Sequence, residues 1–224
     1  MSRGIIEKIV KDASDEGLYI IYAQLRRGGK ITEEFNRAKN KTRLNTFSIS
    51  KSFVSAGIGI ALDEGLLSMD EKICDAFEEY VPENASENLL DTEVRHMLTM
   101  TTGLSEPLFF ADGAERYKVK DWIAHFFNAE FGYKPGERFL YSNFNTYILS
   151  CLIEKRAETN LLEYLRYRLF EPLGIGNPDW TLCPKGHVHA ANGLYLNIDE
   201  LGNFGDMLIN YGNYKGKQLV PKEY

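Results

Sequence analysis

The spacing of apolar and polar residues predicts that the chain begins with a helix and a hairpin. Residues 2–15 carry apolar side chains at helical intervals between charged ones, and Gly17 follows as a helix terminator. Residues 18–25 and 31–36 are rich in strand-forming side chains, and the segment 27–30, Arg-Gly-Gly-Lys, has the composition of a tight turn. We therefore predict one amphipathic helix followed by two antiparallel strands.

Helical spacing dominates the chain from residue 48 to about residue 170. A helix that includes Ser48 and ends at Gly65 is apolar or small on nearly every side, which is typical of a helix buried inside a protein. The further segments with helical spacing are residues 71–79, 92–99, 119–128, 145–158 and 161–170. A last helix is predicted with Asp199 as its N-cap. The side chains expected on its buried face are Leu201, Phe204, Met207 and Leu208.

Ser48 and Lys51 are the first candidates for chemistry, because Lys51 is the only charged residue between positions 44 and 62. A spacing of three residues places a hydroxyl and an amine on the same face of a helix. Burial lowers the pKa of a lysine and makes it a useful proton acceptor near neutral pH. The alternative is a chance spacing on a solvated helix face. Ser52 and Ser55 extend the polar stripe, and they either line the same pocket or allow close helix packing.

Five segments of the chain carry recognisable patterns in a fixed order. They are Ser-x-x-Lys in residues 45–53 with the helix that continues through residues 59–67, Thr-Thr-Gly-Leu at the end of residues 93–104, Pro-Gly and Tyr-Ser-Asn in residues 134–143, Glu-Pro-Leu-Gly-Ile at residues 171–175, and Asn-Gly-Leu-Tyr at residues 192–195 before Asp-Glu-Leu at residues 199–201. Together these segments resemble the motifs of the serine β-lactamase, penicillin-binding protein and esterase superfamily. The resemblance covers roughly residues 17–221, and the Tyr-x-Asn form is similar to the class C β-lactamase, D,D-peptidase and esterase branch.

The resemblance implies roles for four residues. Ser48 would be the nucleophile, and Lys51 and Tyr141 would move its proton to the leaving group. Asn143 would supply a side-chain amide that holds both the lysine and the acyl side of the substrate. Apart from the resemblance, a phenol has an ordinary pKa of about 10 and becomes a competent base only beside a cation. The alternative for Tyr141 is an ordinary packed amphipathic side chain.

The resemblance also implies an α+β fold of the β-lactamase/transpeptidase type. We expect a single domain over residues 1–224. Within it, residues 1–47 would form the N-terminal helix and hairpin, and residues 48–170 a mainly helical region. Residues 171–224 would form loops and a helix that lead to further strands.

The family's third motif is missing from the expected place. This motif is Lys-Thr-Gly or His-x-Gly on a strand that also supplies the second oxyanion-hole N–H, and losing one such donor costs about a hundredfold to a thousandfold in rate. The similar tripeptides at residues 185–187 and 215–217 lie too early and have the wrong pattern. We therefore expect an antiparallel sheet that is incomplete at the C-terminus, because the chain is a fragment or because a second copy or another chain completes it. The alternative to an active hydrolase is a catalytically impaired, truncated or split member that acts as a binding module.

The composition argues against several other classes of protein. A net charge of −6 with interspersed basic residues gives no basic stripe for nucleic acid. No apolar run is long enough to span a membrane. The N-terminus has no signal-peptide core, and three cysteines fit reduced thiols in a cytoplasmic protein.

Neither a cofactor nor a metal is expected. His187-Val188-His189 looks like a metal pair and Cys183 precedes it, but no cluster of carboxylates or cysteines with ligand spacing accompanies them. His189 is expected near the rim of the active site, whereas His96 and His125 are expected to be structural. The predicted function is a serine hydrolase that forms an acyl-enzyme on a small ester, amide or peptide-like substrate. Such substrates are favoured over β-lactam antibiotics, because a cytoplasmic chain would have no periplasmic target to protect.

Overall fold

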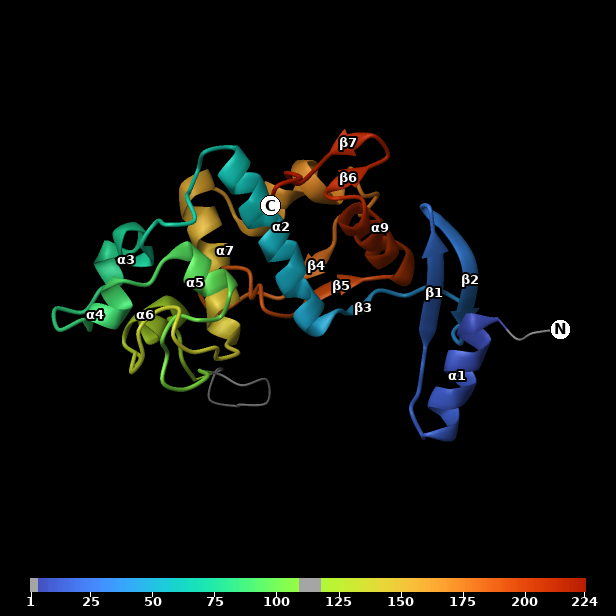
Figure 1. Cartoon of the computed structure of the whole chain (residues 1–224), viewed down its shortest axis with the longest axis horizontal. Coiled ribbons are helices and arrows are strands. Elements are labelled where there is room, and N and C mark those ends of the chain that lie inside the picture. The colour runs from blue at the N-terminus through green and yellow to red at the C-terminus, as the bar shows by residue number, and fades with distance from the viewer. Residues whose placement is uncertain (1–3, 109–117) are drawn as a thin grey trace.

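The chain folds into an N-terminal helix and hairpin beside a larger, mainly helical body (Figure 1). This computed structural model describes residues 4–108 and 118–224. The helices are α1 (Ile5–Asp15), α2 (Ser50–Asp63), α3 (Ile73–Ala76), α4 (Glu87–Leu90), α5 (Val94–Leu98), α6 (Trp122–Phe127), α7 (Asn143–Ala157), α8 (Leu161–Leu165) and α9 (Ile198–Ile209), with 3-10 turns η1 (Phe47–Ile49) and η2 (Glu78–Tyr80) and a π-helical turn η4 (Arg166–Phe170). The strands are β1 (Tyr22–Arg27), β2 (Lys30–Asn36), β3 (Leu44–Asn45), β4 (Asp179–Trp180), β5 (Leu194–Leu196), β6 (Asn213–Tyr214) and β7 (Lys217–Gln218).

The predicted N-terminal helix and hairpin are present. Helix α1 is followed by Gly17 at a φ of +75°, whereas residues 2 and 3 of the predicted helix lie outside the described residues. Strands β1 and β2 pair antiparallel through Gly28 and Gly29, whose φ values of +56° and +72° are the left-handed angles that a two-residue hairpin turn requires. Strand β1 begins at Tyr22, later than predicted, and its pairing starts there opposite Asn36, the last residue of β2.

The described residues form three small antiparallel sheets. Strands β1 and β2 make one pair, β6 and β7 another, and β5 lies between β3 and β4. In the central sheet Leu44 stands opposite Leu196, and Trp180 stands opposite Leu194. Within residues 4–108 and 118–224 no third strand joins the β1–β2 pair. Helices combined with separate antiparallel sheets confirm the predicted α+β class.

Helices α2 and α7 pack against each other through the centre of the body (Figure 1). Phe53 of α2 is fully buried, and its ring stacks on Phe204 of α9 with 3.8 Å between the centroids. A Cβ atom at Gly57 would lie 3.2 Å from a methyl carbon of Leu165, so the glycine permits a close helix contact. The buried character predicted for this helix is therefore confirmed.

The start of this helix differs from the prediction. Ser48 lies in the 3-10 turn η1, and the α-helix itself begins at Ser50. The cause is local, because the amide of Ile49 donates to the carbonyl of Thr46 in a tight i to i+3 bond. The predicted helices of the middle region are present at their expected places. Helix α7 starts two residues earlier than predicted, whereas the other predicted helices are shorter or divided, such as residues 161–170, which split into α8 and η4.

Asp199 does not cap helix α9 as predicted. The N-cap is Asn197, whose side-chain oxygen accepts hydrogen bonds from the amides of Asp199 and Glu200, both at 3.0 Å. The Glu200 carboxylate accepts in return from the amide of Asn197, which completes a capping box. Phe204 and Met207 are buried as expected, whereas Leu208 is half exposed. None of the described helices has the length and apolar character that crossing a membrane requires.

Polar contacts fasten the hairpin to helix α9. Arg26 Nη2 lies 2.9 Å from Asp206 Oδ2, and both side chains are mostly buried. Lys41 Nζ, just after the hairpin, lies 2.9 Å from Asp199 Oδ1. The position of the N-terminal part therefore depends on carboxylates supplied by a helix near the other end of the sequence.

Candidate active site

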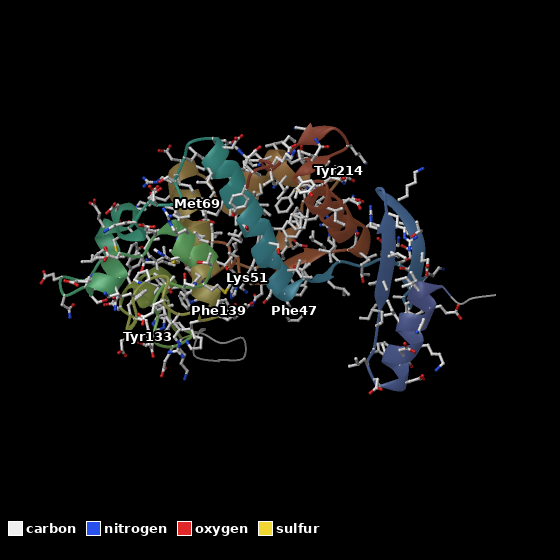
Figure 2. The ribbon with its side chains drawn as sticks, in the orientation of Figure 1. Phe47, Lys51, Met69, Tyr133, Phe139 and Tyr214 are labelled. Carbon is white, nitrogen blue, oxygen red and sulfur yellow. The ribbon has the colours of Figure 1, made fainter. Side chains whose placement is uncertain are left out.

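Hydrogen bonds on its N-terminal side fix the turn that carries Ser48. The hydroxyl and the amide of Thr46 donate to the carbonyl of Leu194 at 2.9 and 2.8 Å, which ties the turn to strand β5. The next residue, Phe47, has a φ of +47°, a left-handed conformation that costs a non-glycine residue about 1–2 kcal/mol. Its amide donates to Asn45 Oδ1 at 2.8 Å. Figure 2 shows Phe47 and Lys51 near the same end of α2.

The structure brings the four predicted site residues together. The Tyr141 hydroxyl donates a hydrogen bond to Ser48 Oγ at 2.7 Å. The Lys51 ammonium donates to Ser48 Oγ at 3.2 Å and to Asn143 Oδ1 at 2.8 Å. Lys51 Nζ also lies 5.0 Å from the centroid of the Tyr141 ring. A hydroxyl, an amine, a phenol and an amide therefore meet at one point.

A fifth group at this point was not predicted from the sequence. The backbone carbonyl of Ala191 accepts a hydrogen bond from Lys51 Nζ at 2.8 Å. Every residue carries a carbonyl, so nothing in the side chain of Ala191 could have identified it. The only available signal was its position immediately before the motif at residues 192–195.

Burial and neighbouring charge shift the acid–base equilibria of Lys51 and Tyr141. Desolvation lowers the pKa of the Lys51 ammonium, and its interaction with Tyr141 opposes this only in part. Burial also disfavours ionisation of the Tyr141 phenol, but hydrogen bonds with Lys51 and Ser48 and the charge of the ammonium outweigh it, so that the pKa of Tyr141 is lowered. Both groups therefore release protons at a lower pH than their free counterparts.

A turn and a helix start set the position of Tyr141 and Asn143. In the preceding turn Gly136 has a φ of +85°, and its amide donates to the carbonyl of Thr101 at 2.7 Å. Ser142 then caps helix α7 by accepting from a backbone amide, and Asn143 is the first residue of that helix. Tyr141 is 38% exposed, so its hydroxyl can reach both Ser48 and a molecule that enters from solvent.

A pocket of about 420 Å³ lies beside Lys51 along helix α2. Ser52 and Ser55 both line it together with Lys51, but Ser48, Tyr141 and Asn143 are not among its lining residues, so the two serines line a neighbouring pocket. The hydroxyls of Ser55 and Tyr224 lie 2.9 Å apart. The polar stripe of α2 therefore continues from the candidate active site along one wall of this pocket.

The histidines lie outside this group. His96 Nδ1 accepts from the amide of Glu93 at the start of α5, which is the structural role expected of it. The ring of His125 packs against an aromatic ring in the core. His187 and His189 do not act as a pair, because His187 contacts a glutamate, whereas the buried His189 ring packs edge-on against Trp122.

Most of the chain is similar to known proteins. The family model described as "Beta-lactamase" matches residues 7–214. Among curated proteins, Penicillin-binding protein 4* of Bacillus subtilis (strain 168) is 25% identical over 193 residues, a match that covers 82% of this chain and 41% of the relative. The chain thus spans less than half the length of that relative.

Solved structures share the fold at lower sequence identity. A putative 6-aminohexanoate-dimer hydrolase from Bacillus anthracis superimposes with a TM-score of 0.80 and 18% identity, covering 99% of this chain and 61% of that one. EstCE1, described as a hydrolase with promiscuous acyltransferase activity, superimposes with a TM-score of 0.76 and 17% identity. This match covers 97% of this chain and 74% of EstCE1. These similarities extend over nearly all of the chain.

Proposed function

Because the chain belongs to the beta-lactamase family, we propose that it is a serine hydrolase that forms an acyl-enzyme on Ser48. The observation that carries the proposal is the contact of the Ser48 hydroxyl with two proton-exchanging groups, Tyr141 at 2.7 Å and Lys51 at 3.2 Å. A serine hydroxyl is a weak nucleophile until a neighbour takes its proton. Both distances suit proton transfer.

In the proposed mechanism, the Ser48 oxygen attacks the carbonyl carbon of the substrate while its proton moves to the phenolate oxygen of Tyr141. The Lys51 ammonium stabilises that phenolate beforehand. Tyr141 then gives the proton to the leaving alkoxide or amine as the bond to the carbonyl carbon breaks. A water molecule next attacks the acyl-enzyme, passes a proton through Tyr141, and releases the acid with the Ser48 hydroxyl restored.

We assign Asn143 to positioning. Its Oδ1 accepts from Lys51 at 2.8 Å, which holds the ammonium between Ser48 and the carbonyl of Ala191. Its amide nitrogen would donate to the acyl side of the substrate. The backbone carbonyl and the amide oxygen together provide Lys51 with two acceptors that carry no net charge, so the ammonium keeps its effect on Tyr141.

The proposed substrates are small esters or amides, including peptide-like ones. Support comes from two proteins of the same fold. One is named a 6-aminohexanoate-dimer hydrolase, and the other is described as a hydrolase with promiscuous acyltransferase activity. Ser48 is exposed and Tyr141 is 38% exposed, so a small acyl group can reach the Ser48 hydroxyl from solvent. No cofactor takes part in the proposed steps.

The test is covalent labelling of the purified chain with a fluorophosphonate, read by intact mass. We expect one adduct per chain, and we expect Ser48→Ala to abolish it. Ser52→Ala is the matched control, because it removes an exposed serine only four residues away, on helix α2, and should leave labelling intact. A chain that stays unlabelled while a full-length relative reacts would refute the proposal.

A second candidate function rests on the solitary β1–β2 pair. Within the described residues this pair has a free edge, and an additional strand would extend its hydrogen-bonded ladder. Here a second copy of the chain would complete the sheet, and the single chain would be catalytically impaired. Sedimentation velocity should then show a dimer, with Ser48 labelling that increases with protein concentration. A strictly monomeric chain would exclude this candidate.

A further inference from the structure

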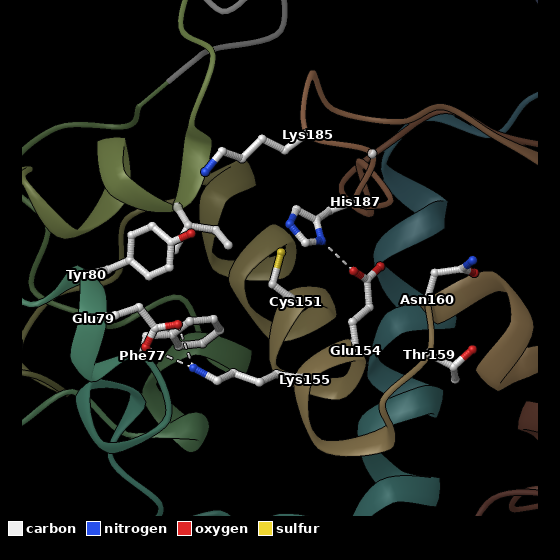
Figure 3. A pocket seen from close by; sticks show the side chains of 12 residues that line it. Phe77, Glu79, Tyr80, Cys151, Glu154, Lys155, Thr159, Asn160, Lys185 and His187 are labelled. Carbon is white, nitrogen blue, oxygen red and sulfur yellow. Dashed lines mark hydrogen bonds and ion pairs between the residues drawn. The ribbon is translucent and has the colours of Figure 1, made fainter.

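A second group of reactive side chains lies away from Ser48, in a pocket of about 510 Å³ between helix α7 and the loop before β5 (Figure 3). Cys151 and Glu154 are three residues apart on α7, so they share one side of the helix. His187 comes from the loop and faces them, with its Nδ1 2.7 Å from Glu154 Oε2. One ligand atom from each of the three side chains lies within 4.8 Å of the other two.

These separations are close to the ones that a bound metal would impose. A tetrahedral Zn²⁺ with bonds of about 2.0–2.3 Å holds its ligand atoms about 3.3–3.6 Å apart. On metal binding, the distance of 2.7 Å between His187 Nδ1 and Glu154 Oε2 would have to increase slightly. Any two ligand atoms whose separation is near 4.8 Å would have to move closer together. The change falls mainly on His187, whose side chain is 32% exposed, because the Glu154 side chain is only 10% exposed and its Oε1 also accepts hydrogen bonds from the backbone amides of Leu161 and Val188 at 3.2 and 3.4 Å.

We propose that Cys151, Glu154 and His187 form a binding site for a borderline-soft divalent cation, with Zn²⁺ as the natural occupant. Thiolate, imidazole and carboxylate are the three ligand types that Zn²⁺ uses, whereas Mg²⁺ and Ca²⁺ prefer oxygen ligands alone. Three protein ligands leave the fourth tetrahedral position directed to the pocket, where water or a small anion can bind. This proposal replaces the expectation of no metal, and it pairs His187 with residues other than His189.

The charges around the pocket do not oppose a cation. Lys155 and Lys185 line it, but Lys155 Nζ lies 2.8 Å from a Glu79 carboxylate oxygen, and Lys185 forms an ion pair with Asp121. Each ammonium is thus neutralised by its own carboxylate. Glu154 pairs with His187, and once that ring gives up its proton to bind a metal, the carboxylate charge faces the cation.

Binding of Zn²⁺ would displace protons from the ligand side chains, and no further reactant is needed. Burial raises the pKa of the Cys151 thiol, so the thiol keeps its proton in the metal-free chain. Zn²⁺ would release that proton and the one shared by His187 and Glu154 to solvent. The metal would then join helix α7 to the loop across 33 residues of sequence between Glu154 and His187.

The test uses the full chain after chelator treatment and dialysis. Equilibrium dialysis against Zn²⁺ with elemental analysis should give one bound ion per chain. Replacement by Co²⁺ should give a sulfur-to-cobalt charge-transfer band, which reports a thiolate ligand directly. Cys151→Ser should remove that band, and Cys151→Ser and His187→Gln should each weaken Zn²⁺ binding by more than about 100-fold, beyond the 10–100-fold typical of losing an outer partner.

Cys74→Ser is the matched control, because Cys74 is also a buried free cysteine but lies outside the group. It should keep both the stoichiometry and the charge-transfer band. Circular dichroism of each variant separates loss of the site from loss of the fold. Absence of bound Zn²⁺ in the folded wild-type chain, or binding that Cys151→Ser leaves unchanged, would overturn the proposal and leave Glu154 and His187 as an ion pair only.

Discussion

Replacing Tyr141 by phenylalanine gives the most direct test of the proposed proton path. The change removes one oxygen atom, the donor that lies 2.7 Å from Ser48 Oγ, and keeps the ring that faces Lys51. Because Tyr141 is 38% exposed, the lost hydrogen bond should cost only about 0.5–1.5 kcal/mol of folding free energy. A folded variant is therefore expected.

The effect on rate should be much larger than the effect on stability. General acid–base catalysis contributes about 10²- to 10⁴-fold, which corresponds to about 2.7–5.4 kcal/mol of activation free energy. The loss should depend on the leaving group, because a phenol is needed most when the departing atom is strongly basic. We expect the largest loss with an amide or an alkyl ester and a smaller loss with a p-nitrophenyl ester.

The assay is turnover of matched p-nitrophenyl and alkyl esters of the same acid, with thermal melting measured in parallel. Tyr133→Phe provides a control, since that ring lies near Arg138 and takes no part in the contacts of Ser48. Equal losses for both esters would show that Tyr141 acts in another way. Unchanged rates for both would refute the proton path.

The remaining predictions concern pH, backbone conformation and helix capping. The Tyr141 phenol must lose its proton before it can act as a base, and its pKa is lowered. Labelling of Ser48 should therefore rise with pH and reach its midpoint below the ordinary phenol pKa of about 10. A midpoint above about 10 would contradict this prediction. Gly103 has a φ of +86°, and Gly103→Ala would place a Cβ atom 2.0 Å from a backbone carbonyl oxygen, so the free energy of unfolding in urea should fall by about 2–3 kcal/mol. Gly65 has a φ of +70° with open space around it, so Gly65→Ala should lower the same free energy by about 1 kcal/mol. Asn197→Ala should lower the free energy of unfolding by about 1 kcal/mol, whereas Asn197→Asp, which keeps an accepting side-chain oxygen at the N-cap, should cost less; equal losses in urea unfolding would contradict the capping role.

Local sequence signals predicted the elements whose cause is local. The two adjacent glycines in the N-terminal hairpin identified its turn, because few other residues accept the required backbone angles. The uncharged run after Lys51 identified a buried helix, since no other environment suits so apolar a surface. The first residue of helix α9 was predicted wrongly, because Asn197 and Asp199 are both residue types that cap helices well. Only the hydrogen bonds of the folded chain distinguish them, and they identify Asn197 as the N-cap.

Contacts between segments that are far apart in the sequence could not be predicted from local sequence signals. The pattern around Ser48 and Tyr141 indicated two separate motifs, and the structure brings them into contact, although their roles stay predictions. The group formed by Cys151, Glu154 and His187 has no sequence signature, because its third member comes from a loop whose path is set by tertiary packing. The sequence analysis expected no metal at His187-Val188-His189, because it looked for further ligands near them in the sequence, whereas Cys151 and Glu154 lie on helix α7.

The acceptor that Ala191 offers to Lys51 has a consequence for mutagenesis. Because this oxygen belongs to the main chain, Ala191→Gly would leave the acceptor in place. Ala191 is fully buried, so a larger side chain there would disturb the packing, and its effect would not report on the acceptor. The contact between Lys51 and this carbonyl is therefore one that exchanging side chains at position 191 does not isolate.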